Sequence, residues 1–315
     1  MRNISRRYFF LGSLALVASS RRRAPESHKV SIIRANSYSG DLTGSIRRIL
    51  VEHGIEVTGK RIVLKPNLVE FSPRAPINTH PVFIAAVLEA FRSLGAKDIR
   101  IAEGPGHRRM TLDLASAAGH FAAIPKFEQA FTDLNLDDVQ RVVLTRPFSS
   151  LKELYLPNTV LGCDLLVSLP KMKTHHWTGA TLSMKNLFGT VPGGIYGWPK
   201  NVLHWSGINE CIADLHYLFP RQFSIVDGIE GMEGNGPILG TAKKAGVIVA
   251  GRHAPSVDAT CCQIMQIDPG KIGYLQLVAE RSGWTPGVAE QIGETVASAK
   301  TRFDLVSDFE KLRLL

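Results

Sequence analysis

Residues 61–104 read RIVLKPNLVEFSPRAPINTHPVFIAAVLEAFRSLGAKDIRIAEG, a stretch with two apolar runs on either side of a helical pattern. The runs Arg61–Asn67 and Asp98–Gly104 predict buried strands, each with a polar end. Between them, His80–Gly95 carries the apolar spacing of an amphipathic helix, and Thr79 is its expected N-cap. A strand, a helix and a strand in this order predict two parallel strands joined by a right-handed crossover.

The same alternation extends over most of the chain. Further strands are expected at Lys29–Ala35, Asp164–Pro170, Gln222–Gly231 and Ala245–Gly251, and further helices at Leu42–Gly54, Trp205–Phe219, Ala254–Ile267 and Ile272–Ser282. The middle is less regular, with short strands expected at Arg141–Leu144 and Lys152–Pro157. We therefore predict an α/β fold: an open, mostly parallel sheet flanked by helices, with a less regular α+β subregion in the middle. One domain is expected over residues 28–290, followed by a C-terminal extension over 291–315.

Residues 1–24 are expected to form a signal peptide of the twin-arginine type. The segment SRRYFF at Ser5–Phe10 resembles the twin-arginine export motif, and the apolar run Tyr8–Ser20 is short for a membrane span. Arg21–Arg23 follow that run, and positive charge at this place favours the twin-arginine route over general secretion. The alternative is a membrane anchor that is never cleaved.

This signal predicts a partner and a location. The partner is the twin-arginine export machinery, and the expected location is the periplasm or another extracytoplasmic space. Once the signal is cleaved, no stable membrane span is expected.

Charge and cysteine content argue against several kinds of partner. The formal net charge is +9, but six arginines at positions 2–23 supply six of those charges, so a cleaved chain would carry +3. The high charge is therefore largely a targeting feature, and no nucleic-acid partner is expected. The four cysteines include no CxxC pair, so the usual iron–sulfur and zinc spacings are missing.

Four of the expected strands end in polar turns. In an open α/β sheet, ligands bind outside the carboxyl ends of the strands. If the four strands are parallel, their turns bring these polar residues toward one rim: Lys65, Asn67, Glu103, Lys171, Lys173, His175, Lys185, Asp227, Glu230 and Glu233. A candidate site is therefore expected at that edge.

The segment Lys171–Gly194, KMKTHHWTGATLSMKNLFGTVPGG, is the most distinctive of these turns. It follows a buried strand, holds three lysines and no acid, and is expected to be a basic, glycine-rich loop. Its lysines and freed backbone N–H groups suit a small anion such as a carboxylate or a phosphate. The phosphate loop GxxxxGK[ST] and the GxSxG elbow are missing, and no GxGxxG fingerprint follows the first strand.

The expected roles in such a site divide by residue type. Histidine titrates near working pH and lysines hold anions, so the expected catalytic residues are His175, Lys173 and Lys185. Carboxylates are the natural ligands of hard divalent cations, so the candidate metal ligands are Glu103, Asp227 and Glu233. Plainer alternatives stay open, because EGPG and the acids at 227–233 also suit solvated turns, and His80 is equally a helix cap or a site residue.

Several short motifs occur together along the chain: VLKPNLV, THP, EGPG, LPKMKTH, TGATLSMKNLFG, VDGIEGMEGNGP and SVDAT. In this order they resemble the family known as domain of unknown function 362, from about Lys60 to about Ser282. The resemblance implies an exported or cytoplasmic α/β protein, and some members carry an added iron–sulfur module that nothing here matches. The chain departs from the family pattern at His253-Ala254, where an aspartate-proline pair is common, but it keeps Asp258.

The resemblance transfers no activity, but it marks nearly the same residues as the strand ends. The substrate-binding residues expected from the two lines together are Lys65, Asn67, His80, Lys171, Asn186 and Asn235. We expect an exported enzyme that acts on a small anionic substrate, with a divalent metal as a candidate cofactor. The alternative is a periplasmic protein that captures an anion or a metal without catalysis.

Overall fold

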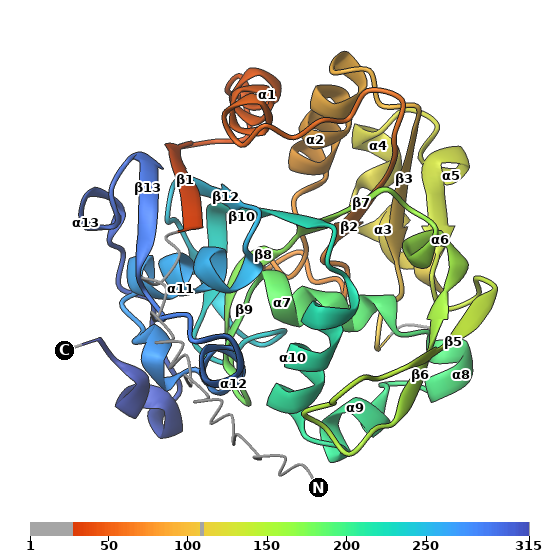
Figure 1. The fold of residues 1–315 in the computed structure, drawn as a ribbon. Coiled ribbons are helices and arrows are strands. Elements are labelled where there is room, and N and C mark those ends of the chain that lie inside the picture. The colour runs from red at the N-terminus through yellow and green to blue at the C-terminus, as the bar shows by residue number, and fades with distance from the viewer. Residues whose placement is uncertain (1–27, 108–109, 315) are drawn as a thin grey trace, which may run out of the picture.

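One open, mostly parallel sheet with helices on both faces forms the body of the described chain (Figure 1). The computed structural model describes residues 28–107 and 110–314. The strands of the sheet are β1 (His28–Arg34), β2 (Arg61–Pro66), β3 (Asp98–Glu103), β4 (Phe131–Asp133), β7 (Leu165–Leu169), β8 (Lys171–His175), β9 (Gly179–Thr181), β10 (Gln222–Glu233), β11 (Thr241–Lys243), β12 (Val247–Gly251) and β13 (Ala289–Gly293). The predicted α/β class is thus confirmed.

Helices cover the sheet and connect its strands. The α-helices are α1 (Leu42–Glu52), α2 (Pro81–Ser93), α3 (Thr111–Ala117), α4 (His120–Ala123), α5 (Phe127–Ala130), α6 (Asn158–Leu161), α7 (Ser183–Asn186), α8 (Gly193–Tyr196), α9 (Asn201–Trp205), α10 (Ile208–Leu218), α11 (Ala254–Ile264), α12 (Gly273–Ser282) and α13 (Val296–Ala299). The 3-10 helices are η1 (Leu187–Thr190), η2 (Pro269–Lys271) and η3 (Ser307–Leu312). The less regular middle holds β5 (Val139–Val143) and β6 (Glu153–Pro157), which pair as a separate antiparallel hairpin.

The strands that carry the predicted site run in one direction. The strand order is β13-β1-β12-β10-β7-β2-β3-β4, and β10, β7, β2 and β3 run parallel to one another. β12 runs antiparallel between β10 and β1. Because parallel strands end at the same edge, Lys65 and Glu103 come to one side of the sheet, together with Lys171 just after β7. The ends of these strands therefore lie at one edge of the sheet, as the sequence predicted for a parallel arrangement.

Alternate residues of the buried strands face two separate cores. On β2, Ile62 and Leu64 pack in the core that α1 and α2 cover, whereas Val63 packs in the core that α10 and α11 cover. Figure 1 shows these two pairs of helices on opposite sides of the sheet. Side chains alternate along a strand, so Lys65 lies on the same face as Val63. That face is the one that α7 approaches.

The predicted N-cap of α2 is wrong by one residue. The His80 ring Nδ1 accepts the Val82 N–H at 3.2 Å, so His80 is the cap. The Thr79 hydroxyl instead accepts the Asn67 N–H at 2.9 Å and donates to the Leu169 carbonyl at 2.5 Å. Its bonds to the ends of β2 and β7 leave it unavailable to the helix.

The predicted loop at Lys171–Gly194 is also wrong, because most of it is regular structure. β8 runs parallel to β10 and antiparallel to β9, and α7, η1 and α8 follow. Lys171, Met172 and Lys173 alternate with the period of a strand, with Met172 in the core. The lysines made the segment look exposed, yet both are buried because each finds its own polar partners.

The two termini differ in what the structure covers. The predicted signal peptide lies outside the described residues. At the other end, β13 pairs with β1 and extends across the predicted boundary at residue 290, and Phe303 is buried in the core. Within the described residues, we find no helix with the length and apolar character needed to cross a membrane.

Candidate functional site

A small polar pocket lies at the carboxyl edge of the sheet, with a cavity volume of about 120 Å³. We call it the inner pocket, and its titratable and amide side chains are Lys65, Asn67, Glu103, His107, Lys173, His175, Lys185, Asn186, Lys200 and His204. Four of these are lysines and one is a carboxylate, an excess of three positive charges if every amine is protonated. Such an excess in a cleft favours an anionic ligand.

Lys65 and Glu103 form a buried ion pair across the neighbouring strands β2 and β3. The Glu103 carboxylate also accepts the backbone N–H groups of Leu68 at 3.3 Å and Gly104 at 2.9 Å. The Lys65 amine donates to the Pro66 carbonyl at 2.9 Å. Each charge is thus satisfied by its partner and by the backbone, as a stable buried pair requires.

Gly189 of η1 packs directly against this ion pair. A Cβ at this position would lie 1.7 Å from Glu103 Oε1 and 2.5 Å from Lys65 Nζ. The Gly189 carbonyl also accepts the Gly104 N–H at 3.0 Å, which holds η1 against the end of β3. Glycine is therefore required here by close approach.

Two amide side chains connect the ion pair to Lys173. Asn186 Oδ1 accepts from Lys65 Nζ at 3.2 Å and from Asn67 Nδ2 at 3.3 Å. Asn67 Oδ1 in turn accepts from Lys173 Nζ at 2.6 Å. The Asn186 amide nitrogen donates back to the Lys65 carbonyl at 3.0 Å. This chain of bonds fixes both amides, so their orientations are set before any ligand binds.

Lys173 lies fully buried on β8 with three carbonyl acceptors. Besides Asn67, its amine donates to the carbonyls of Ile77 at 2.8 Å and Pro237 at 3.4 Å. Burial, followed by the charge of Lys171, lowers the pKa of the Lys173 amine well below its ordinary value. Three carbonyl oxygens oppose that effect because they match the three donors of an ammonium.

Lys185 lines the pocket from α7 and makes no ion pair with a carboxylate among the described residues. Its Nζ lies 3.7 Å from the centroid of the Phe188 ring. Burial, followed by the charge of Lys200, lowers the pKa of the Lys185 amine to about 7. At neutral pH, a substantial share of the molecules therefore holds this amine without its proton.

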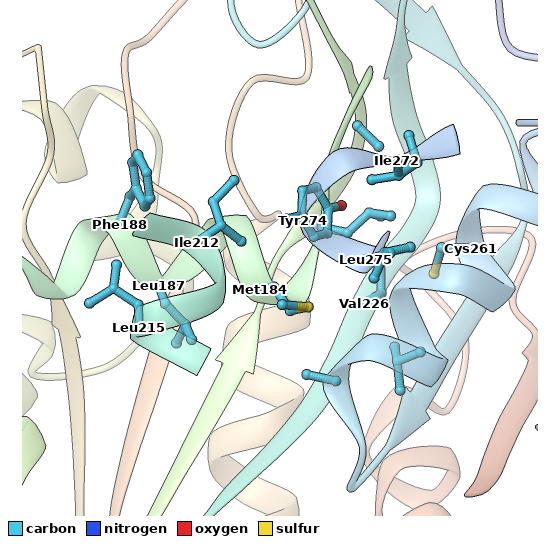
Figure 2. Close-up of a cluster of buried hydrophobic side chains, with 14 of the residues drawn as sticks. Met184, Leu187, Phe188, Ile212, Leu215, Val226, Cys261, Ile272, Tyr274 and Leu275 are labelled. Carbon is cyan, nitrogen blue, oxygen red and sulfur yellow. The ribbon is translucent and has the colours of Figure 1, made fainter. Parts of the chain in front are cut away.

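A buried carboxylate positions the helix that carries Lys185. Asp258 of α11 accepts the backbone N–H groups of Ser183 at 2.7 Å and Met184 at 3.0 Å, at the first turn of α7. Burial raises the pKa of Asp258 to about 7. Figure 2 shows Met184 and the following Leu187 among the buried side chains near Ile212 of α10. The first turn of α7 is thus held by hydrogen bonds and by core packing.

Lys200 is a second amine of the inner pocket with a low pKa. It is buried and donates a hydrogen bond to the Gly104 carbonyl. Burial lowers the pKa of the Lys200 amine to about 7, although Glu103 partly opposes the shift. Like Lys185, it makes no ion pair with a carboxylate in the part of the chain that the structure describes.

The ring of His175 is held in one tautomer. Its Nδ1 accepts the Trp177 N–H at 3.0 Å, so the neutral ring carries its proton on Nε2. Burial, followed by the charge of Lys185, lowers the pKa of His175 well below its ordinary value. Burial likewise lowers the pKa of His204 to about 4. At neutral pH, His175 is therefore a hydrogen-bond donor through Nε2.

Lys171 and Asp227 belong to a separate network outside the inner pocket. The Lys171 amine lies 2.6 Å from the Asp227 carboxylate, and both are buried. Tyr38 donates to Asp227 at 2.9 Å and accepts from Lys171 at 2.9 Å. The His80 ring stacks on Tyr38 at 3.7 Å, and the His80 N–H donates to Asp227 at 3.0 Å. Asn235 lines a neighbouring cavity. The polar residues that the sequence placed on a single rim therefore lie in separate sites.

The three predicted metal ligands each form an ion pair with a different lysine. Glu103 pairs with Lys65, Asp227 pairs with Lys171, and Glu233 pairs with Lys243 at 3.0 Å. Within residues 28–107 and 110–314, no three His, Cys, Asp or Glu side chains are grouped so that they could share a metal ion. Divalent-metal binding stays a prediction, and elemental analysis of the purified protein tests it.

The family of this chain follows from its comparison with known proteins. The model of the family described as "Domain of unknown function (DUF362)" matches residues 62–263, which is more than half of the chain. The chain belongs to the DUF362 family. The match confirms the resemblance carried by the short motifs, and it contains the inner-pocket lysines of β2, β8 and α7.

One curated relative and two solved structures resemble this DUF362 protein. It is 29% identical over 269 residues to the thylakoid-associated protein sll1697 of Synechocystis sp., and the match covers 83% of this chain and 81% of that one. The lactate racemase apoprotein of Thermoanaerobacterium thermosaccharolyticum gives a TM-score of 0.45 at 13% identity, over 76% of this chain. A Thermotoga maritima protein gives 0.40 at 14% identity, over 73% of this chain. This chain spans 57% and 59% of those two structures, respectively.

Several residues that line or support the inner pocket of this DUF362 protein were not predicted from its sequence. Lys200 and His204 lie around α9, where no strand pattern assigns them to the edge of the sheet. Asp258 was singled out only as a residue that the chain keeps from the family pattern, and no place in the site was predicted for it. His107 follows the EGPG turn directly, so its closeness to Glu103 in the sequence was a usable signal.

Proposed function

We propose that this DUF362 protein is an exported enzyme that binds a small anionic substrate in the inner pocket and moves a proton on it. The observation that carries the proposal is the environment of Lys185. This amine lines a cavity, has a pKa lowered to about 7, and makes no ion pair with a carboxylate among the described residues. A bound anion would supply that counter-charge and would favour the protonated amine.

The other inner-pocket groups have complementary roles in this proposal. Lys173 is fixed by its carbonyl acceptors and contributes positive charge beside the anion. Lys200 contributes a second positive charge once the anion raises its pKa. His175 donates a hydrogen bond from Nε2 to an oxygen of the substrate. These groups hold one geometry before the substrate arrives, as electrostatic catalysis requires.

Lys185 is the best candidate for the proton transfer itself. A group is most effective as an acid or base when its pKa lies near the working pH, and the pKa of Lys185 is about 7. Because Nδ1 of His175 accepts the Trp177 N–H, its Nε2 carries the proton and acts as a hydrogen-bond donor. We therefore propose Lys185, in place of His175, as the acid or base. We assign proton transfer to Lys185, which also faces the bound anion, and a contribution of positive charge beside that anion to Lys173 and Lys200.

The export of the enzyme is part of the proposal and rests on the N-terminal motif. Arg6 and Arg7 precede an apolar run in the pattern that the twin-arginine machinery recognises. Replacing both by lysine should keep the protein in the cytoplasm of its host. Fractionation that finds the double variant and the wild type equally exported would contradict this route.

Catalysis is tested with the small molecule that accompanies the purified protein. Mass spectrometry should identify a carboxylate or phosphate ester in the wild type, and loss of that molecule in Lys185→Met. The exposed variant Lys97→Met is the matched control and should keep the molecule bound. Incubation of the wild type with an excess of this anion in deuterated water should change its NMR spectrum, by deuterium exchange or by bond cleavage.

The same experiment separates the enzyme from a binding protein. An anion that stays bound in the wild type but shows no chemical change would favour a periplasmic binding protein without catalysis. A wild-type protein that carries no anion and binds none would contradict both functions.

A further inference from the structure

A second cavity of about 350 Å³ lies directly beside the inner pocket. We call it the outer cavity. Five residues line both spaces: His107, His175, Pro199, His204 and Pro237. The two cavities therefore adjoin each other, and the outer cavity offers free space beside a ligand in the inner pocket.

The outer cavity differs from the inner pocket in chemical character. No lysine, arginine, aspartate or glutamate lines it among the described residues. Trp177, Ile238 and Leu239 supply its apolar surface. Two of the histidines that it shares with the inner pocket, His175 and His204, stay neutral at pH 7 because burial lowers their pKa values. Among the described residues, the outer cavity thus has no lysine, arginine or carboxylate in its lining, although it adjoins a cluster of lysines.

Large apolar side chains at the outer cavity are left open to solvent. Trp177 is 56% exposed and Leu239 is 76% exposed. Exposed apolar surface beside a polar cavity commonly marks a binding surface. Two isolated side chains at a protein surface would carry little meaning, but these two line one cavity that adjoins an anion site.

The wall of the outer cavity is held in place by its own contacts. The Trp177 ring meets the His204 ring edge-on, with 5.0 Å between centroids. It also meets the His176 ring edge-on at 5.3 Å. His176 bonds to the Gly236 carbonyl at 2.7 Å through its Nδ1. A fixed aromatic wall binds an apolar group without the entropy cost of ordering a loop.

From the adjacency of a basic and an apolar cavity we infer that the substrate joins an anionic head to an apolar or aromatic part. The head would bind among the inner-pocket lysines, and the apolar part would lie against Trp177, Ile238 and Leu239. The inference rests on the proposed function, because it needs the anion in the inner pocket. His175 lines both cavities, so its Nε2 donor lies where the head meets the apolar part.

The inference is tested with anions that share one head and differ in their apolar part. The probes are inorganic phosphate and ethyl, butyl and hexyl phosphate, with acetate, butyrate and hexanoate as a second series. Calorimetric titration into the full wild-type chain gives each dissociation constant. We expect the dissociation constant to fall about fourfold for each methylene that is fully buried, and by tenfold or more from ethyl to hexyl phosphate.

Two leucines of equal exposure supply the variant and its control. Leu239→Ser should abolish most of the gain in affinity between ethyl and hexyl phosphate, while the affinity for inorganic phosphate stays unchanged. Leu136 is 75% exposed and lines neither cavity, so Leu136→Ser should bind the whole series like the wild type. Both positions are exposed, so both variants are expected to fold.

The outcomes separate the inference from the proposed function. If inorganic phosphate binds but the dissociation constant is the same for ethyl, butyl and hexyl phosphate, the inference is overturned and the anion site stays in place. Binding of no anion in either series would overturn the proposed function, and the inference with it. Binding to anionic lipid vesicles with no preference for longer free anions would instead identify a membrane surface as the occupant and overturn the inference.

Discussion

Lys65 at the end of β2 and Glu103 at the end of β3 form an ion pair whose side chains are 0% and 2% exposed. Removing two charges from water costs several kcal/mol each, so such a pair persists only when hydrogen bonds complete it. Glu103 has two backbone donors and Lys65 has a backbone and an amide acceptor. The pair therefore neutralises itself and leaves the other lysines of the inner pocket for a ligand.

Removing one partner of this pair should destabilise the fold strongly. We expect Glu103→Gln to lower the free energy of unfolding by about 3–5 kcal/mol, because Lys65 is left buried with a net charge. Urea denaturation measures the change. The double variant Lys65→Met/Glu103→Leu removes both charges and should recover much of the loss. A double variant that is less stable than Glu103→Gln would contradict this explanation.

A methyl group at Gly189 should disturb the same pair. Its Cβ would overlap the Glu103 carboxylate, so we expect Gly189→Ala to cost about 1–3 kcal/mol or more in thermal or urea denaturation. Gly40 has no atom within 4 Å of an added Cβ, and Gly40→Ala should change stability by less than about 0.5 kcal/mol. Equal effects at the two positions would show that the close contact at η1 does not matter.

Anion affinity should weaken as the pH rises through 7. The pKa values of Lys185 and Lys200 are both about 7, and only the protonated amines attract an anion. Sulfate is a suitable probe because its own charge is constant over this range. Above pH 7, its dissociation constant should rise by about tenfold per pH unit for each amine that must be protonated. A constant affinity from pH 6 to pH 8.5 would argue against these two amines.

Asp258 should make the free energy of unfolding depend on pH. Its pKa is raised to about 7, so the folded state keeps a proton that the unfolded state releases near its lower, ordinary pKa. The resulting stabilisation is present at low pH and is lost as the pH rises from about 4 through 7. Asp258→Asn should remove this contribution, so the difference in free energy of unfolding between the wild type and the variant should fall from pH 4 to pH 8 in urea denaturation. A difference that stays constant over this range would contradict this role of Asp258.

The sequence predicted the sheet and seven of the ten side chains of the inner pocket, because the strand ends follow local patterns. Apolar runs locate the strands, and the parallel direction then places Lys65 and Glu103 at one edge. The division of the polar residues into two networks depends on contacts distant in the sequence, such as Tyr38 with Asp227. Lys171 reaches Asp227 and is neutralised by it, whereas Lys185 reaches no carboxylate among the described residues and lines the inner pocket. Spacing alone does not distinguish the two.

Lys200 shows the same limit for single residues. It reaches the inner pocket through its hydrogen bond to Gly104, which lies 96 positions earlier in the chain. No pattern around α9 records that contact. The strand β8 was mistaken for a loop for a related reason, since its alternation was hidden by lysines that the fold buries.

The central claim is that Lys185 belongs to an anion site, and a calorimetric titration of sulfate at pH 6.5 tests it most directly. The wild type and Lys97→Met should bind sulfate with the same affinity. Lys185→Met should bind it at least tenfold more weakly while unfolding at a similar urea concentration. Equal sulfate affinity in the wild type and in Lys185→Met would contradict the account.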